Sequence, residues 1–197
     1  MVILESVQTS FEFSGGALCL DFVNTLGDRP IGRSEKLQAP EDLERWAREA
    51  GVLTGSAPPL SPRFLARAVE LRERLFRIFA GISASTPAPA EDLEALNREL
   101  ASALGHLQLE SAAPGEFAWT FREHDGPERL LWPIVRSAAE LLTSSEAAEI
   151  KVCASETCSW LFVDRSRTHR RRWCDMKSCG NRAKARRHYR RIREHAR

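Results

Sequence analysis

The sequence predicts an α+β protein: a mainly helical N-terminal domain with a small antiparallel β-hairpin, followed by a short basic module that ends in a helix. Three observations lead to this prediction. Apolar residues recur at helical spacing in several segments and alternate at every second position in one pair of segments. Four of the five cysteines form two equally spaced pairs near the C-terminus. The net charge of +2 divides into −9 for residues 1–150 and +11 for residues 151–197.

Length and composition are those of a globular chain. The 197 residues suffice for one or two domains, and the contents of 43% hydrophobic and 28% charged residues are ordinary. No apolar run reaches the ~20 residues that cross a bilayer, and the N-terminus lacks the pattern of a secretory signal. We therefore expect a cytoplasmic protein that does not bind membranes. In that compartment paired cysteines bind metal more often than they form disulfides.

Five segments of the first 145 residues read as helices. Their apolar residues repeat every three to four positions, and several begin with Pro, Ser or acidic residues. The longest has Ser61 as its N-cap. The five ranges are 18–26, 40–50, 61–82, 90–104 and 126–142. In the fourth, the side chains expected to face inward are Leu93, Leu96, Leu100 and Leu104.

Between the fourth and fifth helical segments the period changes to two. Residues 106–110 and 117–121 alternate, and the turn sequence SAAPGE between them predicts a β-hairpin. His106 and His124 flank this hairpin, where isolated histidines are more often structural or exposed than catalytic. The sequence has no HExxH motif, no phosphate-binding glycine loop and no evident Ser/His/Asp set, so we expect no enzyme activity. Residues 1–145 and 149–197 are the expected domains.

Cys153, Cys158, Cys174 and Cys179 have the spacing C-x4-C-x15-C-x4-C. Two short loops can turn both pairs of sulfurs toward one point, which suits the tetrahedral site that one zinc ion forms with four thiolates. Disulfides would require export, a redox dithiol usually has the spacing C-x-x-C, and an iron–sulfur cluster also accepts four thiolates. The spacing favours zinc. Cys19 is expected to be a buried apolar residue.

The cysteine pairs fall on elements typical of a treble-clef-like zinc finger. The first pair encloses a polar knuckle, ASET, and the strand expected at 159–164 would pair with residues 171–174. The second pair lies where a basic helix begins, so that helix N–H groups can stabilise the thiolates. The residues expected to pack this helix against the finger, near Trp160 or Trp173, are Ala185, Tyr189, Ile192 and Ala196.

The helix and the turn before it carry most of the positive charge. Arginine outnumbers lysine here, and the planar guanidinium group suits bidentate contacts with phosphate and guanine. A run of charge is often only solvated, but so many like charges repel each other unless a polyanion neutralises them. The residues expected to contact nucleic acid are Arg165, Arg167, Arg170, Arg171, Arg172, Arg182, Lys184, Arg186, Arg187, Arg190, Arg191 and Arg193.

Three polar residues lie close together in the first helical segment. On a helix, Asp21 shares a face with Asn24 and with Thr25, so these side chains could line a pocket for a small-molecule effector. They could equally cap a helix or satisfy buried backbone groups.

At the tetrapeptide Cys179-Gly180-Asn181-Arg182 the C-terminal segment resembles the CGNR zinc finger, and its WLFVDRSR and RRWC stretches agree with that family. The stretches GGALCLDFVNTL and APEDLERWAREAGVL resemble the ABATE domain, which usually precedes this finger. The resemblance implies a bacterial, stress-linked transcription regulator. It also implies zinc on the four cysteines, DNA contact through the finger and a small ligand sensed by the ABATE domain.

Three functions stay open on the sequence. The chain is a zinc-dependent DNA-binding regulator, an RNA-binding zinc protein, or a ligand-binding or enzymatic domain with the finger as a docking module. The absence of a tyrosine-rich stacking surface argues against RNA. A homodimer would lengthen the short DNA contact of one finger, although no heptad pattern indicates one.

Overall fold

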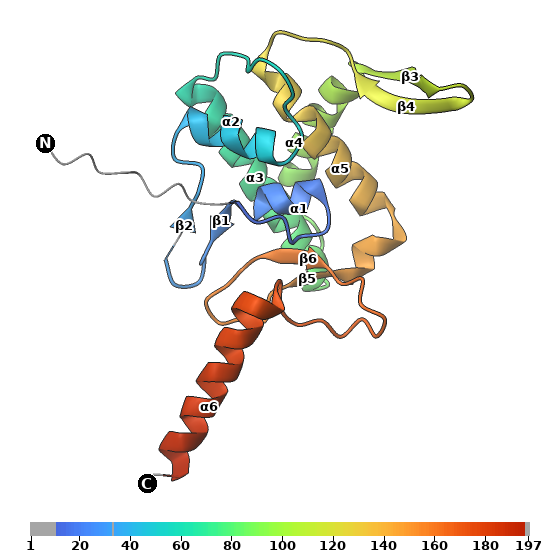
Figure 1. Cartoon of the computed structure of the whole chain (residues 1–197). Helices are drawn as coiled ribbons and strands as arrows, with labels where there is room; N and C mark the ends of the chain where they lie inside the picture. The colour runs from blue at the N-terminus through green and yellow to red at the C-terminus, as the bar shows by residue number, and fades with distance from the viewer. Residues whose placement is uncertain (1–10, 33, 196–197) are drawn as a thin grey trace, which may run out of the picture.

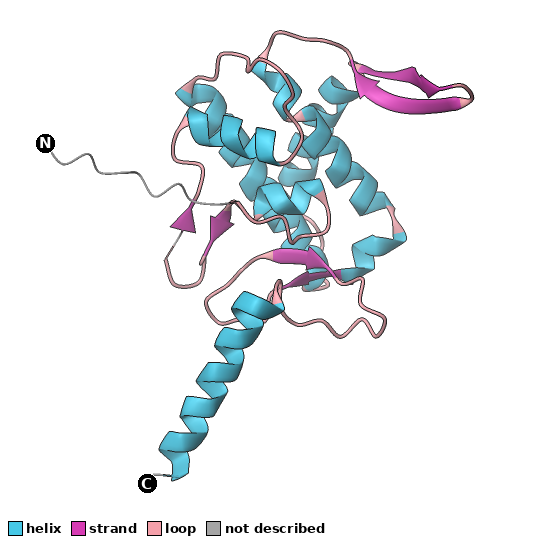
Figure 2. Ribbon diagram, viewed as in Figure 1, coloured by secondary structure: helices cyan, strands magenta, loops and turns pink. Residues whose placement is uncertain are grey.

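The computed structural model describes residues 11–32 and 34–195 of the chain, in which three two-stranded antiparallel sheets accompany the helices (Figures 1 and 2). The N-terminal elements are α1 (Leu18–Val23), β1 (Leu26–Gly27), β2 (Ser34–Glu35), α2 (Pro40–Glu49), α3 (Pro62–Ser83), α4 (Ala90–Leu104), β3 (Leu107–Ala113), β4 (Glu116–Phe121) and α5 (Trp132–Thr143). The C-terminal elements are β5 (Ile150–Val152), β6 (Leu161–Val163), a π-helical turn (Met176–Gly180) and α6 (Asn181–His195). The predicted α+β class is confirmed.

The helices begin where the sequence places their caps. The Ser61 Oγ atom accepts the N–H of Phe64 at 3.1 Å, which satisfies one open donor at the start of α3. The Asp42 carboxylate accepts the N–H of Ala39 at 2.9 Å at the start of α2. Pro133 lies in the first turn of α5, where its missing N–H costs nothing.

The main core surrounds α3, whose apolar stripe lies against α1, α2 and α4, and α5 packs against α1 and α4 (Figure 1). Its largest buried side chains include Trp46 and Phe22, whose ring centroids are 5.0 Å apart, and Trp132. The Cys19 side chain is fully buried in this core, as expected.

The prediction for the buried face of α4 is wrong for two of its four leucines. Leu93 and Leu104 are 42% and 51% exposed, whereas Leu96 is buried. The helix turns Asp92 inward, because the Asp92 carboxylate is fully buried between the guanidinium groups of Arg77 and Arg74 on α3, at 2.6 and 3.1 Å. This ion-pair network sets the rotation of α4, and apolar periodicity alone does not report it.

The predicted β3–β4 hairpin is present and extends from the body (Figure 2). Leu109 pairs with Trp119, and both side chains are more than half exposed. At the base of the hairpin, His106 stacks on Trp132 with centroids 4.1 Å apart, and His124 lies 5.3 Å from the same ring. Both histidines therefore pack as part of an aromatic cluster.

Strand β6 pairs with β5, so the prediction that it pairs with residues 171–174 is wrong. The ladder continues into the knuckle, because the N–H of Cys153 donates to the carbonyl of Trp160 at 2.8 Å. Residues 171–174 run alongside without forming a strand, and the Arg172 carbonyl accepts the N–H of Ala154 at 2.8 Å.

The β5–β6 hairpin packs against the N-terminal domain. Ile150, Leu161 and Val163 are buried in the main core, at most 2% exposed. The side chain of Asn24, just after α1, makes two bonds with the backbone of Leu161: its Nδ2 donates to the carbonyl and its Oδ1 accepts the N–H, both at 2.9 Å. The first half of the finger is therefore fixed to the N-terminal domain.

Replacing Asn24 with alanine should lower the free energy of unfolding by about 2–4 kcal/mol, because it leaves the buried N–H and carbonyl of Leu161 without partners. Asn97→Ala is the matched control, since Asn97 is exposed on α4 and its loss should change stability by less than ~0.5 kcal/mol. Urea denaturation followed by circular dichroism measures both. Equal effects of the two substitutions would contradict the assigned role of Asn24.

Candidate metal centre and basic helix

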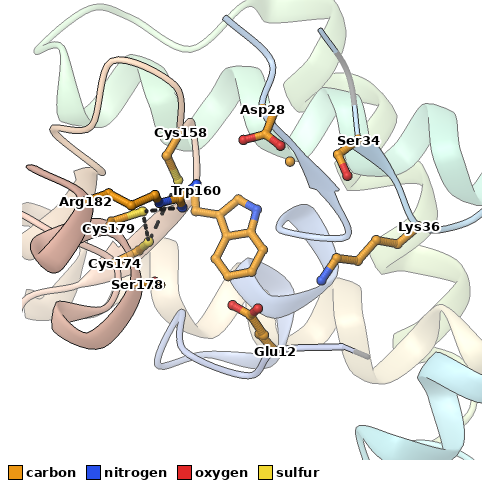
Figure 3. A pocket seen from close by; sticks show the side chains of 11 residues that line it. Glu12, Asp28, Ser34, Lys36, Cys158, Trp160, Cys174, Ser178, Cys179 and Arg182 are labelled. Atoms are coloured by element: carbon orange, nitrogen blue, oxygen red, sulfur yellow. Dashed lines mark hydrogen bonds between the residues drawn. The ribbon is translucent and has the colours of Figure 1, made fainter. Parts of the chain in front are cut away.

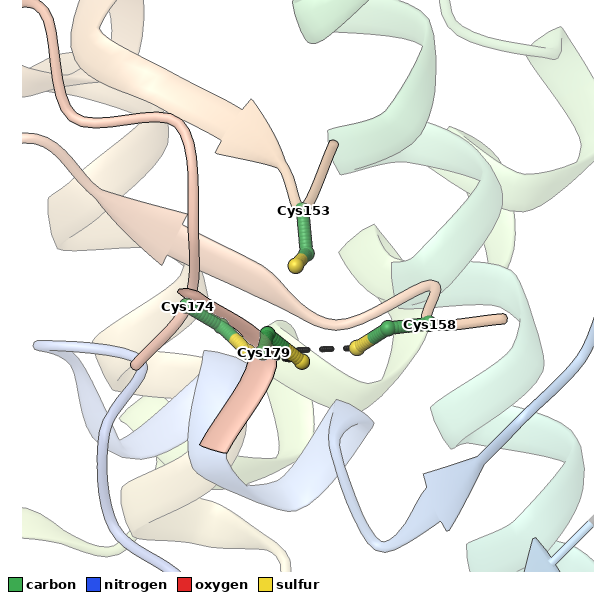
Figure 4. A group of neighbouring side chains, drawn as sticks. All are labelled: Cys153, Cys158, Cys174 and Cys179. Carbon is green, nitrogen blue, oxygen red and sulfur yellow. Dashed lines mark hydrogen bonds between the residues drawn. The ribbon is translucent and has the colours of Figure 1, made fainter. Parts of the chain in front are cut away.

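The four predicted cysteines converge on one point (Figure 4). Their Sγ atoms all lie within 4.8 Å of one another, and the Cys158–Cys174 and Cys174–Cys179 pairs are 3.8 and 3.6 Å apart. A zinc ion with Zn–S bonds of about 2.3 Å holds tetrahedral sulfurs about 3.8 Å apart. The cluster thus has the size and the donor set of a tetrathiolate zinc site.

Two separate segments bring the sulfurs together. Cys153 follows β5 and Cys158 precedes β6, so the knuckle between them closes the hairpin. Cys174 and Cys179 lie on either side of Asp175, whose carboxylate caps the π-helical turn by accepting the N–H of Ser178 at 2.7 Å. The predicted placement of the second pair at a helix start is confirmed.

The end of the Met176 side chain packs over Gly180. A Cβ atom added there would lie 2.8 Å from the Sδ and Cε atoms of Met176 and 3.2 Å from the Trp173 ring. A larger residue would therefore displace the end of Met176, which is half-exposed and can move.

Without a cation, the sulfurs cannot all be ionised. Hydrogen bonds from Cys158 and Cys174 lower the pKa of Cys153, and the same contacts with Cys153 raise the pKa values of Cys158 and Cys174. A divalent ion supplies the charge that lets all four bind as thiolates. The Arg182 Nη2 atom lies 3.3 Å from the Cys179 Sγ atom and offsets part of the negative charge.

The arginine-rich loop between the cysteine pairs is held at Asp164, which sequence reasoning missed. Its fully buried carboxylate accepts the Lys151 ammonium at 2.5 Å, the Ser166 hydroxyl at 2.6 Å and the Arg171 N–H at 2.8 Å. Burial raises the pKa of Asp164, but these hydrogen bonds outweigh it and hold the pKa well below its usual range. In the sequence, Asp164 appears only as part of a DR dipeptide after an apolar strand, and this pattern does not predict the role.

Two predicted nucleic-acid contacts also serve the fold. The Arg165 guanidinium pairs with Glu146 at 2.5 and 2.8 Å and donates to the carbonyl of Gly16 at 2.9 Å. The Arg171 guanidinium donates to the carbonyls of Trp173 and Cys174 and lies 4.5 Å above the centroid of the Phe162 ring. Contact of either residue with DNA stays a prediction.

Helix α6 leaves the body of the molecule (Figure 1). The prediction that its apolar residues pack against the finger is wrong, because Tyr189 and Ile192 are 67% and 51% exposed. Ala196 lies outside the described residues. The contacts with the knuckle come from the first half of the helix, where Arg186 Nη2 donates to Ser155 Oγ at 3.0 Å. The helix therefore presents most of its circumference to solvent.

A groove of about 260 Å³ separates α6 from the knuckle. Arginines from both sides meet there: Arg172 from the loop, and Arg186, Arg187 and Arg190 from the helix. The Arg172 guanidinium lies 5.1 Å from the centroid of the Trp173 ring, which lines the groove and also packs against the cysteine cluster. Apart from Arg165 and Arg171, six residues that the sequence predicted to contact nucleic acid lie outside the groove: Arg167, Arg170, Arg182, Lys184, Arg191 and Arg193.

The predicted ligand-binding residues have partners within the protein. Thr25 donates its hydroxyl to the carbonyl of Phe22 at 2.7 Å and accepts from the buried Arg72 at 3.1 Å. Asp21 accepts the N–H of Gly15 at 2.8 Å, and burial raises its pKa to about 6. Together with the Asn24 bonds, these contacts satisfy backbone groups. This is the alternative role that the sequence left open for the three residues. Ligand contact by the three residues stays a prediction.

Removing zinc with a chelator should release the second half of the finger and leave its hairpin in place. The N–H groups of Ala154 and Gly180 should exchange with solvent at least about tenfold faster, because metal binding and folding are coupled there. Those of Leu161 and Val163, which bond to Asn24 and Gly15, should keep their protection. Hydrogen exchange by NMR, with zinc restored as the control, measures this. Unchanged protection at Gly180 without metal would refute it.

Asp21→Asn should stabilise the protein at neutral pH. The folded pKa of about 6 exceeds the unfolded value of ~3.9, so the folded state binds the proton more tightly. The wild-type free energy of unfolding therefore falls as pH rises from about 4 to about 6, and asparagine removes this loss while still accepting from Gly15. We expect a gain of up to ~2 kcal/mol at pH 7 that shrinks toward pH 5. Denaturation across this range tests it, with the exposed Asp125→Asn as control. A gain independent of pH would be inconsistent with this assignment.

No helix in the described part of the chain is long and apolar enough to cross a membrane.

Two protein families match the chain. One is ABATE, described as "Putative stress-induced transcription regulator", over residues 16–145, and the other is the CGNR zinc finger, over residues 149–192. No curated protein matches. The finger match covers all four cysteines, whose geometry fits one zinc ion. The chain therefore belongs to the ABATE family and carries a CGNR zinc finger at its C-terminal end.

Proposed function

We propose that this chain is a transcription regulator that binds DNA through α6 and the arginine groove, while its N-terminal domain senses a small ligand. The observation that carries the proposal is the groove, where four arginines from two segments converge beside an exposed helix. Guanidinium groups suit bidentate contact with phosphate. No acidic residue lies between residues 181 and 193, and Glu156 is the acidic residue among those lining the groove.

The direction of α6 supports the same function. Residues 1–150 carry a net charge of −9, which repels a phosphate backbone. Because α6 extends away from this body (Figure 1), its arginines can approach DNA with little opposition. Its 15 residues span about 22 Å, and an α-helix fits the ~12 Å wide major groove of B-DNA. Exposed Tyr189 and Ile192 add apolar surface suited to thymine methyl groups.

Trp173 gives a specific reason to test a second candidate. Aromatic rings that lie beside arginines stack unpaired bases in proteins that bind single strands. The Trp173 ring lines the groove, which makes single-stranded DNA or RNA the competing ligand. We favour duplex DNA for two reasons. Helix α6 is a single basic helix that extends from the body, as a major-groove helix does. Among the residues that line this groove, Trp173 is the one aromatic residue, whereas binding of a single strand stacks successive bases on several rings.

The remaining parts of the proposal follow from the family and the charge pattern. We propose that the protein acts in the cytoplasm during stress and works by binding rather than by catalysis. We also propose that it binds as a homodimer, because one finger covers few base pairs and a second copy would extend the contact.

Fluorescence anisotropy with zinc-loaded protein and random duplex, single-stranded DNA or structured RNA tests the proposal. If six to eight phosphates are neutralised, log K for the duplex should fall against log salt with a slope of roughly −5 to −7. Arg186→Glu with Arg190→Glu should flatten this slope by about two units. The matched control Arg63→Glu with Arg98→Glu makes the same charge change on exposed body residues and should leave the slope unaltered. Tighter binding of a single strand, or equal slopes in both variants, would rule out the proposed interface.

A further inference from the structure

A cavity of about 170 Å³ lies where the finger meets the N-terminal domain. The body contributes Asp28, Ser34 and Lys36 from the β1–β2 region, and the finger contributes Trp160 and Arg182. Three of the zinc ligands, Cys158, Cys174 and Cys179, form the wall on the finger side, so the cavity borders the metal centre. Figure 3 shows the indole ring of Trp160 at the centre, with the polar side chains of the body around it and Arg182 and the cysteines together on one side. This site is separate from the three polar residues that the sequence suggested.

Charged groups of both signs face this cavity. The carboxylates of Glu12 and Asp28 and the ammonium of Lys36 line it, with the Lys36 Nζ atom 5.2 Å from the Trp160 ring centroid. Lys36 is half-buried, and burial lowers its pKa. The backbone of Asp28 has a φ of 48°, in the left-handed region that few residues other than glycine adopt. The cavity thus combines an aromatic surface with separated acidic and basic groups.

The size of the cavity limits what it can hold. Pockets for drug-sized ligands measure about 300–1,000 Å³, and this cavity, at about 170 Å³, is smaller. A nucleotide would not fit. A molecule with one ammonium group, one carboxylate and a small side chain would.

We propose that this cavity binds a small zwitterion of amino-acid size. Its ammonium group contacts Asp28, its carboxylate contacts Lys36, and its side chain lies against the indole of Trp160. Any effect of this ligand on DNA binding rests on the proposed function. In that function, the cavity is the site at which the protein senses its small ligand.

The position of the cavity links it to both the metal centre and α6. Trp160 is two residues from Cys158, and Arg182 contacts Cys179 and belongs to the first turn of α6. Arg182 of the second half of the finger lines the same cavity as the body residues, so a ligand that fills the cavity stabilises the arrangement in which the two parts meet. Because such coupling is reciprocal, DNA that prefers this arrangement would raise the affinity for the ligand.

The experiment uses the zinc-loaded full-length chain and the standard L-amino acids, each at millimolar concentration. Thermal unfolding and the indole N–H resonance of Trp160, assigned with Trp160→Phe, report binding. We expect at least one amino acid to raise Tm and to shift this resonance. Asp28→Asn and Lys36→Met should each weaken that binding at least tenfold while keeping zinc content and DNA affinity in the absence of amino acid. Asp125→Asn, an exposed carboxylate elsewhere, is the control.

No shift of the Trp160 resonance with any amino acid would overturn the proposal, as would equal binding by both cavity variants and the wild type. Two variants are used because they remove opposite charges, so a folding defect in one leaves the other to decide. Failure of DNA binding would be seen separately, through the salt slope. If an amino acid binds but leaves DNA affinity unchanged, the binding site is supported and its regulatory link is refuted.

Discussion

The alternation of side chains along β6 determines how the two domains are joined. Leu161 and Val163 point into the core of the N-terminal domain, whereas Trp160 and Phe162 lie with the cysteines in the small core of the finger. Successive residues of a strand face opposite sides, so one short hairpin serves both cores. The two bonds from Asn24 to Leu161 fix its register. The metal centre therefore has a defined position on the domain.

The finger has two halves that differ in what holds them. The β5–β6 half is stabilised by apolar burial against α1 and α3, which is independent of metal. The half from Cys174 onward has a core of a few cysteines and aromatic rings, too small to offset its chain entropy and the repulsion among its arginines. Zinc, the Arg171 bonds to the carbonyls of Trp173 and Cys174, and the Arg186–Ser155 bond join this half to the hairpin. The metal site and the knuckle contacts together therefore set the direction of α6.

The sequence predicted the features that depend on residues close together along the chain. Helix caps, the β3–β4 hairpin and the sulfur spacing are short-range patterns, and all of them appear in the structure. The strand partner of β6 was predicted wrongly, because residues 150–152 and 171–174 are both short and only contact with the main core selects the former. The role of Asn24 depends on a partner 137 residues away. The outward direction of α6 likewise follows from contacts made by the knuckle rather than from the apolar spacing of Tyr189 and Ile192.

These constraints indicate how a ligand signal could reach DNA. A rigid rotation of the whole finger would break the buried Asn24–Leu161 bonds and expose Leu161 and Val163, which is costly. Movement of the second half alone costs less free energy, because fewer buried contacts hold it. A ligand in the cavity can affect this half, because Arg182 forms part of the cavity wall. The ligand would then act on the orientation or order of α6 relative to a fixed hairpin. Under the proposed function such a regulator would need no hinge between its domains, because the two-state element would lie within the finger, between the hairpin and the half that we expect zinc to hold.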